Sequence, residues 1–303
     1  MSEKKLLEKL QHPFLVNINY AFQDRDNLYL IADLLTGGDL RFHIGKKKKF
    51  SEKETKFMIA CMVQGLEYMH DQGVIHRDIK PENVVMEDSG YVRITDMGIA
   101  KILRTDNSTD TSGTPGYMAP EVMCRQNHTY AVDYFALGVM AYEFMMGKRP
   151  YVGRNRKEIR DMIFSKQVQI KRNELPDGWS LEAADFINKC LQRKPGNRLG
   201  LNGPAEVKQH IWLRDYDWQS LMEKTLEAPF KPALKADNFE KKATSKDDVF
   251  KGDDPIEMQK NAILLFRPSI QKQFEGYEYY SYGAGTPIPA PIFQRLSKKE
   301  RIE

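Results

Sequence analysis

The residues with the clearest chemical potential in this chain stand close together in His76-Arg77-Asp78-Ile79-Lys80-Pro81-Glu82-Asn83. They lie between a helix-like segment and the apolar run Val84-Val85-Met86. The Asp78 carboxylate can accept a hydroxyl proton, the Lys80 ammonium group can neutralise charge on a moving phosphoryl group, and the Asn83 carboxamide can hold a magnesium ion. The stretch therefore has the composition that metal-assisted phosphoryl transfer requires.

A second carboxylate follows at a spacing that suits the same chemistry. Asp96-Met97-Gly98 begins thirteen residues after Asn83, behind the strand-like segment Tyr91 to Thr95. An aspartate there can bridge a metal ion to nucleotide phosphates. Taken alone, the tripeptide His76-Arg77-Asp78 also fits a surface turn with a solvated charge cluster, so the interpretation depends on further motifs.

Apolar periodicity predicts the elements that must position these side chains. Ser51-Glu52-Lys53-Glu54 has the form of a capping box, and the apolar positions from Phe57 to Met69 predict a long helix that delivers the chain to the catalytic stretch. Two antiparallel strands, Val16 to Phe22 and Leu28 to Leu34, are separated by a hairpin signal at 23–27.

Three more helices are predicted further on. Ala131 to Met146 is apolar almost all round, as expected of a helix buried at the centre of a domain. Asp133, near its start, is a charge in an apolar setting, and taken by itself it is typical of a helix cap. Amphipathic helices are expected at Asn155 to Ser165 and Leu181 to Gln192.

Composition bounds the class of protein. The 303 residues, 41% of them hydrophobic, suffice for one two-lobed domain with a tail. The net charge of +4 is too small to indicate a nucleic-acid partner. Cys61, Cys124 and Cys190 stand far apart among apolar neighbours, which predicts buried thiols in a reducing compartment. No apolar run is long enough for a transmembrane segment, and we expect a cytoplasmic location without excluding the nucleus.

A third motif, Gly113-Thr114-Pro115-Gly116-Tyr117-Met118-Ala119-Pro120-Glu121, completes an order that resembles the eukaryotic protein kinase signature. The resemblance implies an α+β, protein-kinase-like fold with a mostly helical C-lobe. It also implies a Ser/Thr protein kinase that uses ATP and Mg²⁺ and acts on protein substrates. The roles that it implies are Asp78 as base, Lys80 on the phosphoryl group, Thr114 bracing Asp78, Asn83 and Asp96 on metal, Asp133 holding the catalytic-loop backbone, and a structural pair of Glu121 with Arg198.

From His12 onward the chain is similar to the AGC group of kinases. The segments that look most like the YANK (serine/threonine kinase 32) subfamily are 12–17, 33–41 and 147–151. This resemblance divides the chain into an N-lobe remnant at 1–35, a C-lobe at 36–213 and an AGC-type tail at 214–303 with a hydrophobic motif. The nucleotide-binding residues that it implies are Glu3, Asp33, Leu35, Val85 and Phe239.

The AGC resemblance also implies how a substrate is selected. Asp39, Glu82 and Glu143 stand where AGC kinases place acids that face the residues upstream of the target hydroxyl. Because charge-assisted pairs with arginine are strong and directional, we expect Arg or Lys two to three residues before the phosphorylated Ser or Thr.

The resemblance suggests a built-in activating acid. Asp110 occupies the place of the phosphothreonine that AGC kinases carry three residues before Gly113. A carboxylate there can pair with Arg77 and Lys101, although with less charge and fewer acceptor oxygens than a phosphate.

The N-terminus departs from the kinase pattern. Kinases place a glycine-rich loop and a lysine-bearing strand before the helix that carries Glu3, and here only Met1 and Ser2 precede it. We therefore expect an incomplete N-lobe and poor phosphate transfer by the chain as given. Two hypotheses stay open. The four residues Asp78, Lys80, Asn83 and Asp96 favour a non-specific serine/threonine kinase, whereas the absent lysine favours a pseudokinase or scaffold without efficient ATP clamping.

Overall fold

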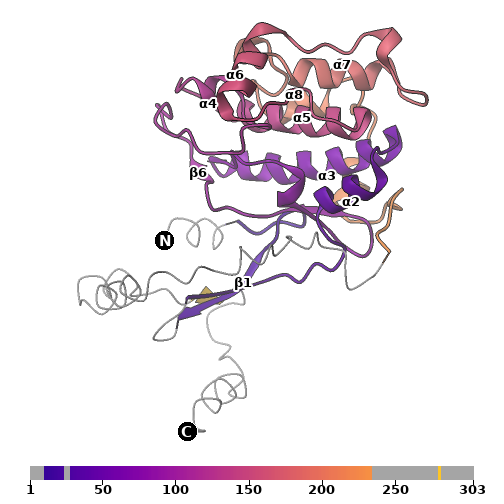
Figure 1. The fold of residues 1–303 in the computed structure, drawn as a ribbon. Helices are drawn as coiled ribbons and strands as arrows, with labels where there is room; N and C mark the ends of the chain where they lie inside the picture. The colour runs from indigo at the N-terminus through magenta and orange to yellow at the C-terminus, as the bar shows by residue number, and fades with distance from the viewer. Residues whose placement is uncertain (1–9, 24–27, 234–278, 281–303) are drawn as a thin grey trace, which may run out of the picture. The chain divides into compact units, whose positions relative to one another are not determined.

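The computed structural model describes residues 10–23, 28–233 and 279–280, and the chain divides into two units (Figure 1). The smaller unit contains residues 18–33 and 252–303, and the larger one contains 1–17 and 34–251. No helix among the described residues is both long enough and apolar enough to cross a membrane.

The smaller unit contains a three-stranded antiparallel sheet in the order β2-β1-β7. β1 (Ile18–Gln23) pairs with β2 (Leu28–Ala32), with Ala21 opposite Leu30, and β7 (Tyr279–Tyr280) pairs along the other edge of β1. The β1–β2 hairpin confirms the two strands that apolar alternation and the polar segment 23–27 predict.

The larger unit is mostly helical. Its helices before the catalytic stretch are α2 (Leu40–Lys47) and α3 (Glu52–Asp71). The later helices are α4 (Pro120–Met123), α5 (Ala131–Met146), α6 (Arg156–Ser165), α7 (Leu181–Cys190), α8 (Pro204–Lys208) and α9 (Trp218–Met222), with 3₁₀ turns η1 (Pro81–Asn83), η2 (Arg172–Glu174) and η3 (Pro195–Asn197). The expected α+β class is confirmed.

The long helix α3 begins as its sequence predicts. The Ser51 hydroxyl accepts from the Glu54 amide at 3.3 Å, and the Glu54 carboxylate accepts from the Ser51 amide at 2.8 Å. This reciprocal capping box satisfies two donors that a helix start otherwise leaves open. The helix then ends at Asp71, just before the catalytic stretch.

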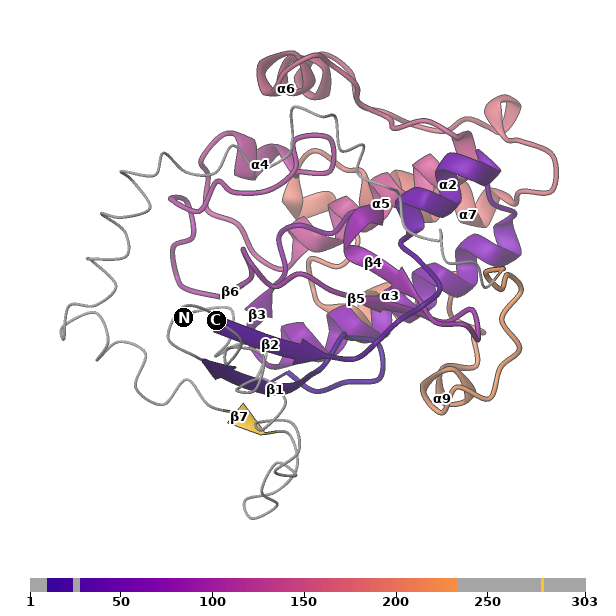
Figure 2. The same ribbon diagram turned by 60° about the horizontal axis from the view of Figure 1, so that its bottom comes forward.

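The buried helix α5 forms the centre of the larger unit, where it packs against α3 and α7 (Figures 1 and 2). α5 needs a glycine where it meets α7, because a methyl group at Gly138 would lie 2.5 Å from the Cβ of Cys190. This close approach explains a glycine inside a helix, where glycine is otherwise unfavourable.

Two short pairs of antiparallel strands flank the catalytic stretch. β3 (Val74–Ile75) pairs with β6 (Lys101–Ile102), and β4 (Val84–Met86) pairs with β5 (Val92–Ile94). The catalytic stretch therefore begins at the end of β3 and ends at the start of β4.

The cysteine prediction is correct for two of the three thiols. Cys61 and Cys190 are buried, but Cys124 is exposed. Cys124 follows the last residue of α4, a helix of four residues, so its apolar sequence neighbours do not enclose it. The prediction of a third buried thiol is wrong.

Candidate active site

A buried carboxylate fixes the backbone of the catalytic stretch. Asp133 in α5 accepts from the amides of His76 and Arg77 at 3.0 and 2.8 Å, and its Oδ2 lies 2.9 Å from Nε2 of His70. Burial alone would raise the pKa of Asp133, but the bond with His70 and the charges of nearby histidines outweigh it and lower this pKa. Asp133 thus holds the loop backbone, while Tyr130 occupies the N-cap position of α5.

The Asp78 carboxylate sits at the centre of a side-chain network. Its Oδ2 accepts from Lys80 Nζ at 2.5 Å and from the Asn83 amide at 3.1 Å. Its Oδ1 accepts from the hydroxyl and backbone amide of Thr114 at 2.7 and 3.0 Å. Burial would raise the pKa of Asp78, but the bonds from Lys80 and Thr114 lower it. The carboxylate therefore stays ionised at neutral pH in a fixed orientation.

The β4–β5 hairpin brings the two predicted metal ligands together. The Thr95 amide donates to the Asn83 carbonyl at 2.9 Å, so Asp96, the next residue, emerges beside Asn83. Asn83 donates its side-chain amide hydrogens to Asp78, and Asp96 is exposed. The Asn83 amide oxygen and the Asp96 carboxylate are hard oxygen groups of the kind that would suit Mg²⁺.

The predicted nucleotide-binding residues are only partly described. Val85 on β4 is half-buried, whereas its strand neighbours are fully buried, so it lies on the face of the hairpin away from the core. Leu35 is half-buried in the larger unit, and Asp33 accepts from Asn19 within the smaller one. Glu3 and Phe239 lie outside the described residues, as do the hydrophobic motif up to residue 278 and the tail segment 234–278.

Three cations surround Asp110, as two of them were predicted to do. Lys101 and Arg104 each donate to its carboxylate, and Nη1 of Arg77 lies 3.8 Å from it. Arg77 donates its other guanidinium hydrogens to the Ile99 carbonyl, with Nε at 2.8 Å. Burial would raise the pKa of Asp110, but these bonds from Lys101 and Arg104 lower it.

Two of the predicted substrate acids, Glu82 and Glu143, converge on a cation of the chain itself. Arg41 Nε lies 2.9 Å from Glu82, and Arg41 Nη1 lies 2.8 Å from Glu143. The Tyr117 hydroxyl donates to Glu143 at 2.5 Å and accepts from Arg41. The acids that were expected to face a substrate therefore already share a guanidinium group.

The third predicted substrate acid has a local structural role. Asp39 is the N-cap of α2, and its carboxylate accepts from the Phe42 amide at 2.8 Å. Burial raises its pKa. An aspartate directly before an apolar helix start is a typical cap, so the sequence contained this signal.

The predicted structural pair is fully enclosed. Arg198 donates from Nη1 and Nη2 to Glu121 at 2.5 and 2.9 Å, and the two residues are 1% and 3% exposed. The two parallel bonds form the bidentate geometry in which a guanidinium group matches a carboxylate. The pair fastens α4 to the loop after η3.

Four residues of these networks were not predicted: His70, Arg41, Tyr117 and Arg104. Arg41 bonds to partners 41 and 102 positions away, and His70 to one 63 positions away, so no local pattern reveals them. Arg104 is different, because it stands only six positions before Asp110. A charge search of that loop would have found it.

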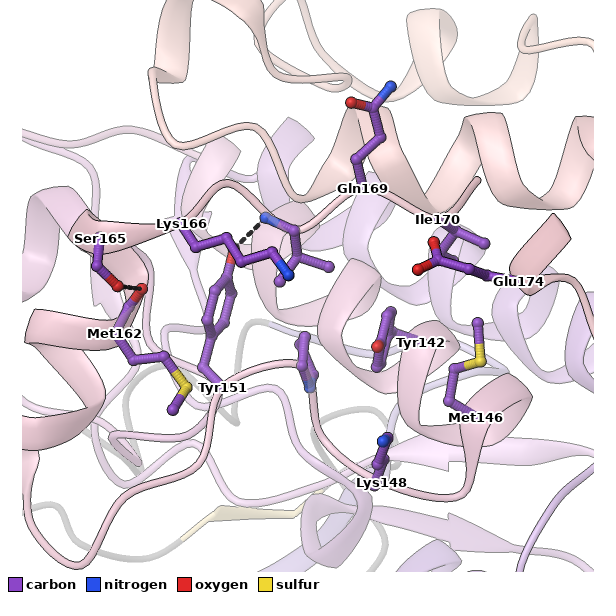
Figure 3. Close-up of a pocket in the computed structure, with 12 residues that line it drawn as sticks. Tyr142, Met146, Lys148, Tyr151, Met162, Ser165, Lys166, Gln169, Ile170 and Glu174 are labelled. Carbon is purple, nitrogen blue, oxygen red and sulfur yellow. Dashed lines mark hydrogen bonds between the residues drawn. The ribbon is translucent and has the colours of Figure 1, made fainter. Parts of the chain in front are cut away.

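A cavity of about 630 Å³ lies in the larger unit at a separate place, between α5 and the segment that follows α6 (Figure 3). Its lining includes Tyr142, Lys148, Tyr151, Lys166 and Glu174. None of the predicted site residues lines it. Its lining mixes apolar, polar and charged side chains, and we assign it no part in the site.

A fixed carboxylate beside an ammonium group, a hydroxyl and two oxygen ligands is the arrangement of a phosphoryl-transfer site. The chain belongs to the protein kinase family, since residues 1–213 match the model of the protein kinase domain.

Proteins with sequences similar to this chain are named as protein kinases. The chain is 36% identical to Protein kinase 2 of Dictyostelium discoideum over 280 residues, covering 92% of this chain and 57% of the relative. It is 37% identical to a probable serine/threonine-protein kinase of the same organism over 237 residues, covering 78% and 51%. It is 38% identical to ribosomal protein S6 kinase alpha-1 of Rattus norvegicus over 236 residues, covering 77% and 31%. The chain thus spans between 31% and 57% of the length of these relatives.

Proposed function

We propose that this chain carries the catalytic site of a Ser/Thr protein kinase that transfers the γ-phosphate of ATP to serine or threonine hydroxyls of protein substrates. The observation that carries the proposal is the Asp78 network, in which Lys80, Thr114 and Asn83 all bond to one carboxylate at 2.5–3.1 Å. A fixed, ionised carboxylate can orient an attacking hydroxyl and accept its proton.

Each residue of the network has a separate task in this proposal. Asp78 binds the substrate hydroxyl, and Thr114 keeps the carboxylate from rotating. Lys80, 19% exposed at its side chain, is accessible to a phosphoryl oxygen while it stays bonded to Asp78. Asn83 and Asp96 would hold Mg²⁺, which neutralises charge on the nucleotide phosphates when bound. Val85 and Leu35 are proposed to contact the nucleotide base.

Substrate selection and control are part of the same proposal. Glu82 and Glu143, with Asp39 nearby, are proposed to favour basic residues upstream of the target hydroxyl. Asp110, held by Arg77, Lys101 and Arg104, is proposed to replace an activating phosphate. The similarity to a ribosomal S6 kinase supports the AGC group, and within it we propose the YANK subfamily.

The test is peptide phosphorylation by the complete natural protein with radiolabelled ATP and Mg²⁺. Asp78→Asn should lower the rate by roughly 100- to 10,000-fold, because general-base catalysis contributes about that much. Asp215→Asn, the same chemical change on a side chain that is 84% exposed, is the matched control and should leave the rate unchanged.

Two other results would contradict the proposal. An unchanged rate in Asp78→Asn would remove Asp78 from the mechanism. Nucleotide binding without any transfer by the natural protein would favour the pseudokinase or scaffold hypothesis.

A further inference from the structure

Arg41 is held by more partners than a helix-surface arginine needs. Its Nε bonds to Glu82 at 2.9 Å, Nη1 to Glu143 at 2.8 Å, and Nη2 to the Tyr117 hydroxyl. Burial alone would lower the pKa of Arg41, but the bond and charge of Glu143 outweigh it and raise this pKa. Nη2 also donates to Glu143 at 3.4 Å, so four of the five guanidinium donors are used within the chain.

This cluster lies beside the reacting groups. Glu82 is in η1, four residues after Asp78, and η1 contacts α2, the helix that carries Arg41. Tyr117 is three residues after Thr114, which bonds to Asp78 at 2.7 Å. Two short chain segments therefore connect the Arg41 cluster to the carboxylate that would orient the substrate hydroxyl.

The cluster is also accessible on one side. The Glu82 side chain is 42% exposed and that of Arg41 is 22% exposed, whereas that of Glu143 is only 8% exposed. Two carboxylates against one guanidinium group leave a net charge of −1. A basic side chain arriving from solvent would meet Glu82 first, with one oxygen already bonded to Arg41.

We propose that Arg41 is an internal competitor for the basic side chain of a substrate, and that it weakens the selection of arginine by Glu82 and Glu143. The inference rests on the proposed kinase function and deepens it. A guanidinium group binds a carboxylate best through two parallel bonds, and Arg41 already occupies Glu143 in this way, at 2.8 and 3.4 Å. A substrate arginine must either displace it or use the outer oxygen of Glu82 alone.

A purely structural role for Arg41 makes a different prediction. If Arg41 only fastened α2 to η1 and α5, its removal would lower activity toward all peptides by the same factor. If it competes, its removal changes the ratio between arginine-containing peptides and their alanine counterparts. The ratio is therefore the quantity to measure.

The experiment uses the complete natural protein and a serine peptide series that differs only in carrying Arg, Ala or Glu at one upstream position. We expect the natural protein to prefer Arg over Ala in kcat/KM by less than about tenfold, and Arg41→Ala to raise this preference at least about tenfold further, since charge-assisted hydrogen bonds are worth that much. Arg41→Lys retains the cation and should keep the preference low. Lys46→Ala, which removes a cation from the same helix without touching either acid, should change nothing.

A binding measurement accompanies the kinetics, with fluorescence anisotropy of the same peptides carrying Ala in place of the acceptor serine. Tyr117→Phe, which removes one of the four bonds to Arg41, serves as a milder variant if Arg41→Ala does not fold, and should raise the preference for arginine by a smaller factor. Either variant leaving the Arg-to-Ala ratio unchanged would overturn the inference while transfer itself supports the kinase proposal. Gain of arginine binding without transfer to any peptide would uphold the inference and reject the kinase proposal.

Discussion

Two charged clusters border the catalytic stretch, and their compositions are opposite. In the first, the single carboxylate of Asp110 lies among three cations, Arg77, Lys101 and Arg104. In the second, the single guanidinium group of Arg41 lies between two carboxylates, Glu82 and Glu143. The first carries an excess charge of +2 and the second an excess of −1.

The difference shows what each cluster is able to attract. Nη1 of Arg77 is buried and has no hydrogen bond among the described residues, and Asp110 lies 3.8 Å from it, so the first cluster holds a donor that is not fully satisfied. The second has an exposed carboxylate available for a further cation.

The largest effect on stability is expected at the buried pair of Glu121 and Arg198, where each charge is balanced by one opposite charge. Arg198→Ala removes the one ion-pair partner that Glu121, 3% exposed, has in the described part of the chain, and breaking such a pair costs about 3–5 kcal/mol. The free energy of unfolding from urea titration should fall by that amount. Arg214→Ala, which removes an exposed arginine, is the matched control and should cost less than about 1 kcal/mol. Equal costs would mean that the buried pair is not a stabilising feature.

The next effect concerns activity and the cluster around Asp110. Asp110→Ala leaves three neighbouring cations without their anion, so we expect kcat to fall roughly 10- to 100-fold, corresponding to about 1.4–2.8 kcal/mol. Asp110→Glu should retain most of the activity. Asp106→Ala, in the same loop but exposed, should leave activity unchanged.

Phosphatase treatment separates the built-in acid from a phosphorylated neighbour. If Asp110 is sufficient, treated and untreated kinase should be equally active. Loss of activity on treatment, together with full activity of Asp110→Ala, would instead favour phosphorylation of Thr109 or Thr111.

The sequence predicts the elements of this fold better than the partners within its site. The capping box at Ser51 and the apolar segment at 131–146 both led to helices with the expected starts, because each signal is local. Asp133 allowed two readings from sequence, a cap or a backbone anchor, since the amides that it accepts from lie 56 and 57 positions away. The bonds from the His76 and Arg77 amides, which only the folded chain reveals, identify Asp133 as the backbone anchor.

In the site, too, the sequence predicts the residues better than their bonding partners. Asp78, Lys80 and Thr114 were predicted from motif order, and the structure brings them within bonding distance. The bonds of Arg41 to Glu82 and Glu143 were not predicted, because three segments distant in sequence meet there. A sequence motif identifies the acidic residues but not the side chains that form ion pairs with them.

A smaller effect is expected from the hydroxyl that links Arg41 to Glu143. Tyr117→Phe removes a donor to Glu143 and an acceptor for Arg41, and burial together with the charge of Glu143 raises the pKa of this tyrosine. The loss should cost about 1–3 kcal/mol in the free energy of unfolding, as expected for a hydrogen bond to a charged group. Tyr142→Phe, the same change on a half-buried tyrosine beside the cavity of Figure 3, is the control and should cost less. A cost below that of the control would show that the hydroxyl is dispensable.

The smallest expected effect is on the pH dependence of stability, and it concerns His12, which stays neutral near cations, unlike the charged groups of the two clusters. Burial and the charges of Lys224 and Lys208 lower the pKa of His12 to about 4, and its ring stacks on Tyr68 at 4.8 Å. As the pH falls below about 6.5, the unfolded chain takes up a proton at His12 and the folded chain does not until about pH 4. Stability contributed by the neutral ring is therefore present above pH 6.5 and is lost between 6.5 and 4.

The corresponding variant is His12→Phe, which keeps the stack on Tyr68 and removes the titration. The free energy of unfolding of the natural protein should fall by about 1–2 kcal/mol more than that of the variant between pH 7 and pH 4.5, after allowance for solvent screening at a partly exposed ring. Urea titrations at these two pH values measure the difference. If both proteins lose the same free energy of unfolding between these pH values, His12 does not contribute to the pH dependence. Carboxylates such as Asp110 would then account for all of it, because their pKa is lowered in the folded chain and acid therefore destabilises the fold.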